Sequence, residues 1–308
     1  MKPNISICIV LWSCTSKKTD YAISGENSKH ELYNGPIIDM HIHAFDSTIE
    51  NHMDQTFARF EEHNIVKAVV SPALRSNEGY PSEIWYNEKP NTVLIGDGLR
   101  LTPDKLRQKY EEGKLHLMAE FLPFYEGMLA TDERLIPYFD LAEELDIPVG
   151  YHIYPGGATG HAYNVFPKIR AKLASPLQLE EVLIARPNLR IYIMHAGWPY
   201  LEDMKALMFV HPQVYVDLGV ISWARPKNDF HNYLKGLVDA GFDKRIMFGS
   251  DQLRNADNID IAINAINSAD FLTHAQKADI FYNNASRFLK LPEEEIKRHQ
   301  EKAAQNRR

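Results

Sequence analysis

The sequence alternates eight times between a short apolar run and a longer stretch with the periodicity of an amphipathic helix. The apolar runs predict strands at 37–43, 66–71, 92–96, 115–121, 147–153, 189–195, 213–218 and 245–250. Alternation of this kind favours parallel strands joined by crossover helices, because parallel neighbours need a connection that returns the chain to the same end of the sheet. We therefore expect an α/β fold built from strand–helix units.

Several of the connecting stretches carry helix signals of their own. Thr102 precedes Pro103, which is typical of a helix cap followed by a proline in the first turn. Residues 132–145 place their apolar side chains on one face. Further helices are predicted at 176–184, 201–209, 259–266 and 276–282. Eight units would close as a single (β/α)8 TIM barrel, although an open doubly wound sheet could also hold eight strands, and the count alone does not decide.

The length of 308 residues fits one such barrel, which typically needs about 250 residues, plus short extensions. With 44% hydrophobic and 24% charged residues, the composition is that of an ordinary globular protein. The net charge of −7 is scattered in both signs, which argues against a nucleic-acid partner, since that partner requires a basic face. The predicted organisation is a signal peptide at 1–14, a polar tether at 15–35, the barrel at 36–291 and a charged C-terminal tail at 292–308.

The N-terminal segment predicts export. Lys2 precedes an apolar run at 5–12, which is long enough for the core of a signal peptide and too short to span a bilayer. The sequence LWSC that ends at Cys14 resembles the bacterial lipoprotein signal, in which the cysteine is lipidated and becomes the first residue. Cleavage after Ser16 without a lipid, or an apolar segment of the barrel itself, are the alternatives. We expect an exported protein, either anchored to the membrane as a lipoprotein or periplasmic.

Both cysteines of the chain, Cys8 and Cys14, lie within the first fourteen residues. The predicted barrel therefore has no disulfide, no thiolate ligand and no cysteine nucleophile. Any metal held there must be bound by His, Asp or Glu.

Polar side chains recur at the carboxyl ends of the predicted strands, where the catalytic groups of a barrel lie. His41 and His43 end the first strand, and residues two apart on a strand face the same way, so both imidazoles could bind one ion. The fourth, fifth, sixth and eighth strands end at Glu120, His152, His195 and Asp251. These six residues are the candidate site.

Each of these residues alone has a structural explanation. A histidine can be buried and hydrogen-bonded, a glutamate can be half of an ion pair, and Asp251 could cap the next helix. Together they point elsewhere, because burying four or five such groups in one barrel mouth is costly unless a cation compensates. Imidazole and carboxylate ligands without thiolate suit zinc, and also manganese or iron. We therefore predict one or two divalent ions, with zinc first.

Four segments resemble the amidohydrolase superfamily, and within it the amidohydrolase-related family that includes decarboxylases. They are IIDMHIHAF, SPLQLEEVLIARPNLRIYIMHAGWP, RIMFGSDQ and YNNASRFL. The segments occur in the family's order, and the resemblance extends over residues 35–291. It implies a metal-dependent hydrolase with a TIM-barrel fold.

The resemblance also implies roles for the candidate residues. His41, His43 and His152 would bind metal, and Asp251 would bind it as well as accept a proton from the attacking water. His195 would bind a second metal or polarise the substrate and water. Some relatives use a carboxylated lysine at the fourth strand to bridge two metals. This chain has Glu120 there, which leaves open both a carboxylate bridge and a single-ion site.

Three residues that follow strand ends are candidates for binding the substrate: Tyr154, Trp198 and Arg254. Each could equally be a packing or ion-pair residue. The longest loop at this end, 154–175, contains glycines that allow close approach to a ligand.

Three functions are open at this point. The first is a hydrolase that attacks the amide, ester or lactone carbonyl of a small molecule. The second is a decarboxylase or hydratase acting on a small carboxylic acid, which Arg254 favours because a guanidinium pairs well with a carboxylate. The third is a non-enzymatic metal-binding or scaffold lipoprotein, which the complete set of histidines and carboxylates argues against. The expected partner is a small-molecule substrate, membrane contact is expected only through a lipid, and the sequence leaves open a homo-oligomer.

Overall fold

The computed structural model describes residues 31–45, 51–73, 81–155, 164 and 166–306. Its eight strands are parallel and are hydrogen-bonded to one another in the order of the sequence. They are β1 (Ile37–Ala44), β2 (Ile65–Pro72), β3 (Val93–Asp97), β4 (Leu117–Phe121), β5 (Val149–His152), β6 (Ile191–Met194), β7 (Val214–Asp217) and β8 (Ile246–Met247). The predicted signal peptide, with Cys14 and most of the tether, lies outside the described residues.

The first and last strands meet and nearly close the sheet into a barrel. Met40 donates its backbone N–H to the carbonyl of Phe248 at 3.0 Å, and His43 donates to the carbonyl of Gln252 at 3.1 Å. The predicted (β/α)8 barrel of parallel strands is therefore confirmed, and the open doubly wound sheet is not what forms.

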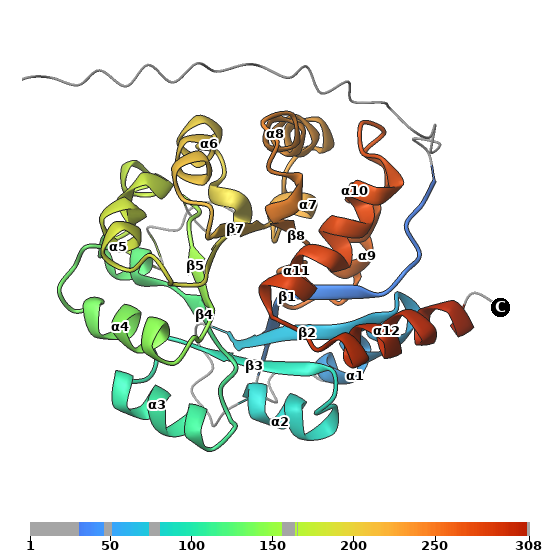
Figure 1. The fold of residues 1–308 in the computed structure, drawn as a ribbon, viewed down its shortest axis with the longest axis horizontal. Coiled ribbons are helices and arrows are strands. Elements are labelled where there is room, and N and C mark those ends of the chain that lie inside the picture. The colour runs from blue at the N-terminus through green and yellow to red at the C-terminus, as the bar shows by residue number, and fades with distance from the viewer. Residues whose placement is uncertain (1–30, 46–50, 74–80, 156–163, 165, 307–308) are drawn as a thin grey trace, which may run out of the picture.

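The helices surround the strands on the outside (Figure 1). In the described residues they are α1 (His52–Glu62), α2 (Pro81–Glu88), α3 (Pro103–Glu111), α4 (Ile136–Glu144), α5 (Glu180–Ala185), α6 (Leu201–Val210), α7 (Ile221–Ala224), α8 (Lys227–Asp239), α9 (Asp257–Asn267), α10 (His274–Ala278), α11 (Asn284–Phe288) and α12 (Glu293–Asn306). Thr102 caps α3 by accepting a hydrogen bond from the backbone N–H of Lys105, as predicted. Within the part of the chain that the structure covers, every helix is too short or too polar to cross a bilayer.

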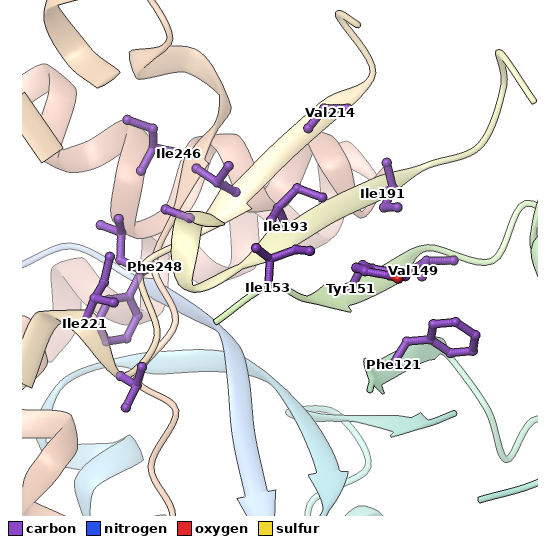
Figure 2. Close-up of a cluster of buried hydrophobic side chains, with 14 of the residues drawn as sticks. Phe121, Val149, Tyr151, Ile153, Ile191, Ile193, Val214, Ile221, Ile246 and Phe248 are labelled. Carbon is purple, nitrogen blue, oxygen red and sulfur yellow. The ribbon is translucent and has the colours of Figure 1, made fainter. Parts of the chain in front are cut away.

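The larger part of the core lies between the strands and the helices. Figure 2 shows Val149, Ile191, Val214 and Ile246, which come from four neighbouring strands and are all buried. A second cluster combines alternate residues of the strands, which fill the barrel interior, with Tyr282, Ala285 and Phe288 from the C-terminal helices. The apolar filling supports the strands from both faces and leaves their carboxyl ends to carry polar groups.

Two strands carry an extra residue just where the candidate site begins. The pairing of β1 with β2 shifts register between Asp39 and Ile42, and the pairing of β4 with β5 shifts between Met118 and Phe121. In both places an advance of three residues along one strand is paired with an advance of two residues along its neighbour, as in a β-bulge. A β-bulge changes the direction of the side chains that follow it. The bulge in β4 falls at Glu120, whose side chain turns into the barrel mouth.

The helix α12 lies within the predicted C-terminal tail and packs back onto the barrel. Ile296 contacts the interior cluster, and His299 hydrogen-bonds through Nδ1 to the hydroxyl of Tyr282 at 2.9 Å. Lys67 of β2 forms an ion pair with Glu295 of α12, with Nζ and Oε1 2.8 Å apart. The side chains of this pair are only 10% and 18% exposed, so the pair holds α12 from within the packed interface.

Replacing Glu295 by alanine is expected to lower the free energy of unfolding by about 3 kcal/mol, because it leaves the buried Lys67 ammonium without its partner. Urea unfolding followed by circular dichroism measures the change. The neighbouring Glu294 is exposed, and Glu294→Ala is the matched control, expected to unfold like the unchanged protein. Equal midpoints for the two variants would show that the ion pair does not hold the helix.

Candidate metal centre

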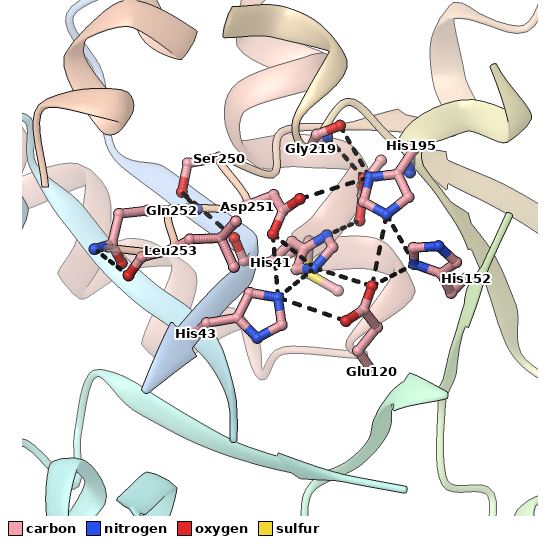
Figure 3. A network of polar contacts seen from close by, with 12 residues as sticks. His41, His43, Glu120, His152, His195, Gly219, Ser250, Asp251, Gln252 and Leu253 are labelled. Atoms are coloured by element: carbon pink, nitrogen blue, oxygen red, sulfur yellow. Dashed lines mark hydrogen bonds and ion pairs between the residues drawn. The ribbon is translucent and has the colours of Figure 1, made fainter. Parts of the chain in front are cut away.

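Six polar side chains from the carboxyl ends of five strands meet in the barrel mouth (Figure 3). The structure brings together all six residues of the predicted site: His41, His43, Glu120, His152, His195 and Asp251. All are buried except Glu120, whose side chain is nevertheless only 6% exposed. No apolar core requires such a set, so the arrangement itself indicates a binding site.

Three ligand atoms form a compact triangle beside β1. Nε2 of His41 and Nε2 of His43 are 3.2 Å apart. Oδ1 of Asp251 lies 3.1 Å from Nε2 of His43 and 3.4 Å from Nε2 of His41. Nitrogen and oxygen ligands lie about 2.0–2.2 Å from zinc, so neighbouring ligands of one ion are about 3.0–3.5 Å apart. The triangle therefore has the spacing of ligands to a common ion.

A second group of ligand atoms lies opposite the first. Oε1 of Glu120 is 2.6 Å from Nδ1 of His152, and Nε2 of His195 is 3.0 Å from the same Nδ1. The other oxygen of Glu120, Oε2, lies 3.5 Å from Nε2 of His43 in the first group. Glu120 thus stands between the two groups, a place that suits a carboxylate bridging two ions as well as a carboxylate beside one.

Buried negative charge dominates the site. Burying carboxylates is costly unless positive charge compensates. Burial alone would lower the pKa of His41, but the nearby carboxylates outweigh burial and raise that pKa to about 10, so the surroundings of this imidazole favour positive charge. Oδ1 of Asp251 has no hydrogen-bond partner among the described residues. A divalent ion would satisfy this oxygen and supply the positive charge, so the residues fit such an ion.

Two glycines allow the strands to close around His41. A Cβ atom on Gly219 would lie 2.8 Å from Nδ1 of His41 and 3.0 Å from Cβ of Asp251. A Cβ atom on Gly249 would lie 3.0 Å from Cβ of His41. Since these neighbours are side chains that the site itself uses, a larger residue at either position would displace the candidate ligands.

The turn after β6 holds His195 in an unusual backbone conformation. His195, Ala196 and Gly197 have φ angles of 60°, 49° and 65°. A non-glycine residue in this left-handed region costs about 1 kcal/mol or more, and such residues cluster at functional sites. The surrounding contacts must therefore stabilise this turn, which points the imidazole of His195 into the mouth.

The rim beside His195 is aromatic and carries a cation. The ring of Tyr154 lies 5.3 Å from that of His195 and 5.6 Å from that of Trp198. The guanidinium of Arg225 lies 4.5 Å above the Trp198 ring. The predicted Tyr154 and Trp198 are thus next to the site, and Arg225 is a rim residue that sequence analysis did not single out.

Arg254, the third predicted substrate residue, lies elsewhere on the rim. It is exposed, and its guanidinium stands 5.7 Å from the centre of the Phe45 ring. It is a cation on the β8 side of the mouth, whereas Arg225 stands on the Trp198 side.

Asp217 is the other residue that sequence analysis did not identify. It is fully buried at the end of β7, and its Oδ2 lies 3.2 Å from Nδ1 of His41. The signal was present, because Asp217 is a carboxylate at the end of the apolar run 213–218, as Asp251 is beyond the next.

Comparison with known proteins connects this site to a family. A family model described as "Amidohydrolase" matches residues 96–291. No curated protein matched the chain in sequence. Among solved structures, an uncharacterised TIM-barrel protein of Bordetella bronchiseptica is 16% identical with a TM-score of 0.61, and the match covers 83% of this chain and 98% of that one.

Two further solved structures are similar in fold. A "probable 2-pyrone-4,6-dicarboxylic acid hydrolase" of Acinetobacter baumannii is 17% identical, with a TM-score of 0.59 over 84% of this chain and 100% of that one. A 5-carboxyvanillate decarboxylase of Novosphingobium aromaticivorans, complexed with manganese, is 13% identical, with a TM-score of 0.56 over 86% of this chain and 99% of that one. At these identities the likeness concerns the fold alone.

Proposed function

The chain belongs to the amidohydrolase family, and from this we propose that it is a metal-dependent hydrolase that activates water to attack the amide, ester or lactone carbonyl of a small molecule. One observation carries the proposal: six imidazoles and carboxylates, contributed by five strands, converge in a buried mouth with the spacing of metal ligands. His41, His43, His152 and Asp251 would hold the ion, with Glu120 beside or between the two ligand groups. Zinc is the first candidate, and manganese and iron are the others.

When bound, a divalent ion supplies Lewis acidity, which makes nearby water more acidic and polarises a substrate oxygen. The residues of this chain then handle protons and position the substrate. The second oxygen of Asp251, Oδ2, is not part of the ligand triangle and lies 3.8 Å from Nδ1 of His195, so Asp251 can accept the proton of the attacking water and then return it to the leaving group. His195 presents Nε2 to the same space, and Glu120 and Asp251 outweigh its burial and raise its pKa; as an imidazolium it can donate a hydrogen bond from Nε2 to the oxygen that gains negative charge. Tyr154 and Trp198 would form an apolar wall against the substrate.

A decarboxylase or hydratase acting on a small carboxylic acid is the second candidate, and one observation favours it. The guanidinium of Arg225 stacks on the ring of Trp198, which itself contacts Tyr154 at the rim of the site. In this position Arg225 could pair with a substrate carboxylate. The predicted Arg254 offers a second cation on the opposite side of the mouth.

A substrate panel separates these functions. Metal-loaded protein should release protons from small esters or lactones, or ammonia or an amine from small amides, and should lose this activity after treatment with a chelator. The same preparation is tested on small carboxylic acids for release of carbon dioxide. Hydrolysis without release of carbon dioxide is the expected result, whereas carbon dioxide release from an acid would favour the decarboxylase. Absence of any metal-dependent turnover across the panel would count against both enzymes.

A further inference from the structure

We propose that Asp217 is a positioning residue that determines which ring nitrogen of His41 and of His195 faces the metal centre. The proposal rests on the metal site of the proposed function, and it concerns a residue outside the ligand set described above. Asp217 would act through the two histidines and would not itself contact the ion or the substrate.

The two oxygens of Asp217 have separate partners. Oδ1 accepts hydrogen bonds from the backbone N–H of His195 at 2.9 Å and from that of Gly219 at 2.8 Å. Oδ2 lies at ion-pair distance, 3.2 Å, from Nδ1 of His41, and neither atom has a hydrogen-bond partner among the described residues. One buried carboxylate therefore joins the ends of β6 and β7 to a histidine of β1.

For His41 this contact selects the tautomer. A carboxylate oxygen can only accept a hydrogen bond, so Nδ1 is the nitrogen that carries the proton. Nε2 is then left as the atom that faces His43 and Asp251, with its lone pair available to an ion. A carboxylate that orients a metal-binding histidine in this way also makes the imidazole a stronger ligand.

For His195 the effect passes through the backbone. Nδ1 of His195 lies 3.1 Å from the carbonyl oxygen of Gly219, which can also only accept, so the proton again belongs on Nδ1 (Figure 3). The Gly219 peptide is itself fixed by its N–H bond to Asp217. Nε2 of His195 is therefore the atom that meets the centre, on the side of His152 and Glu120.

Asp217 could also be considered a ligand, because with His41 and His195 it forms a group close enough to hold an ion. Its own contacts argue otherwise. Oδ1 already accepts two N–H bonds, Oδ2 lies 3.2 Å from Nδ1 of His41, and the side chain is fully buried. An ion at Oδ2 would have to replace the proton on Nδ1.

The variant Asp217→Asn tests the proposal sharply. The two backbone N–H groups need an oxygen, so the new amide must keep its oxygen at the Oδ1 position and turn its NH2 towards His41. Nδ1 would then have to accept a hydrogen bond, and the proton of His41 would move to Nε2, the metal-facing atom. We expect the dissociation constant for zinc or manganese, measured by chelator competition, to rise about 10- to 100-fold while the number of ions bound at saturation is unchanged.

Asp39→Asn is the matched control. Oδ1 of Asp39 also accepts two backbone N–H bonds, from His41 at 3.0 Å and Ser250 at 2.9 Å, but unlike Asp217 it forms no ion pair with a histidine of the described residues. This variant should bind zinc as the unchanged protein does. If Asp217 has a merely structural role, Asp217→Asn should behave in the same way, because it keeps both backbone hydrogen bonds.

Three results would overturn the proposal. Asp217→Asn could bind metal as tightly as the unchanged protein, or it could lose one ion at saturation, which would make Asp217 a ligand. The third needs no variant: in the zinc-loaded protein, nitrogen NMR of the histidine rings should find the His41 proton on Nδ1, and a proton on Nε2 would contradict the assignment. If the unchanged protein binds neither zinc nor manganese, the proposed function itself fails, and this inference fails with it.

Discussion

Replacing both His41 and His43 by alanine is expected to remove the divalent ion held by the ligand triangle beside β1. The two Nε2 atoms supply two corners of the ligand triangle, and Asp251 alone remains at the third. A single carboxylate on this side cannot hold an ion against dialysis, since affinity depends on several ligands being fixed in place. Metal content after dialysis, measured by elemental analysis, should fall by one ion per chain in the variant relative to the unchanged protein.

A second cluster of potential ligands provides the control. Glu62, His63 and Asp260 lie close enough on the surface to hold an ion. However, the guanidinium of Arg59 already forms ion pairs with Glu62 at 2.6 Å and Asp260 at 3.1 Å. The negative charge of this cluster is therefore already balanced by a side chain. His63→Ala should therefore keep its full metal content. If the variant without His41 and His43 retained all its metal and His63→Ala lost it, the metal would have to be assigned to the surface cluster instead.

The alanine substitutions also remove two buried rings, so folding must be checked separately. The pair His41→Asn and His43→Asn keeps more of the volume and a polar atom at each position. Circular dichroism and the urea midpoint of both double variants show whether the barrel is intact. Loss of metal from a folded variant is the result that assigns the ligands.

The strands could be predicted from the sequence because burial on both faces makes each of them a short apolar run. Each predicted strand overlaps an observed one, and the polar turns between units mark where they end. Closure of the barrel could not be predicted in the same way, since it depends on the pairing of Met40 with Phe248, which lie about two hundred residues apart in the sequence. No local pattern encodes a contact of that range.

The helix ends were predicted less well. The stretch 132–145 was expected to be helical throughout, but α4 begins at Ile136, because the backbone at Asp132–Leu135 forms a turn in which Asp132 accepts from the N–H of Leu135. The predicted helix at 276–282 is divided by a π-helical segment, Asp279–Asn283, between α10 and α11. Apolar periodicity sets the face of a helix and says little about its first and last residues.

For the site, sequence reasoning found the residues that end strands and missed those that act through others. Alternation along β1 correctly places His41 and His43 on one face, as their 3.2 Å contact shows. The bulge that turns Glu120 inward has no sequence signature, and its inward direction could be learned only from the strand pairing. Asp217 was missed because its importance lies in contacts with His41 and Gly219, which are distant in sequence or made by backbone.

Asp251 is placed for proton transfer more clearly than any other group in the mouth. Burial would raise the pKa of Asp251, but His41, His43 and His195 outweigh burial and lower it, so the residue is a carboxylate at neutral pH. Its backbone lies in the left-handed region with φ of 48°, which asparagine tolerates better than most residues. Asp251→Asn therefore keeps the shape, the backbone conformation and one ligand oxygen, and removes the capacity to accept a proton.

Asp251→Asn is expected to reduce turnover of the substrate identified with the panel by about 10²- to 10⁴-fold, the usual contribution of a positioned general base. The variant should remain folded, because its backbone N–H still donates to the carbonyl of His41 at 2.7 Å. Steady-state kinetics across pH 5–9, at saturating metal, measures the effect. Raising the pH should not restore activity to the variant, since an amide has no proton to lose in this range.

The exposed Asp257, which pairs with Arg59, provides the matched control, and Asp257→Asn should retain full turnover. An Asp251→Asn variant that turns over substrate with an unchanged pH profile would remove Asp251 from the chemistry and leave it, at most, as a ligand.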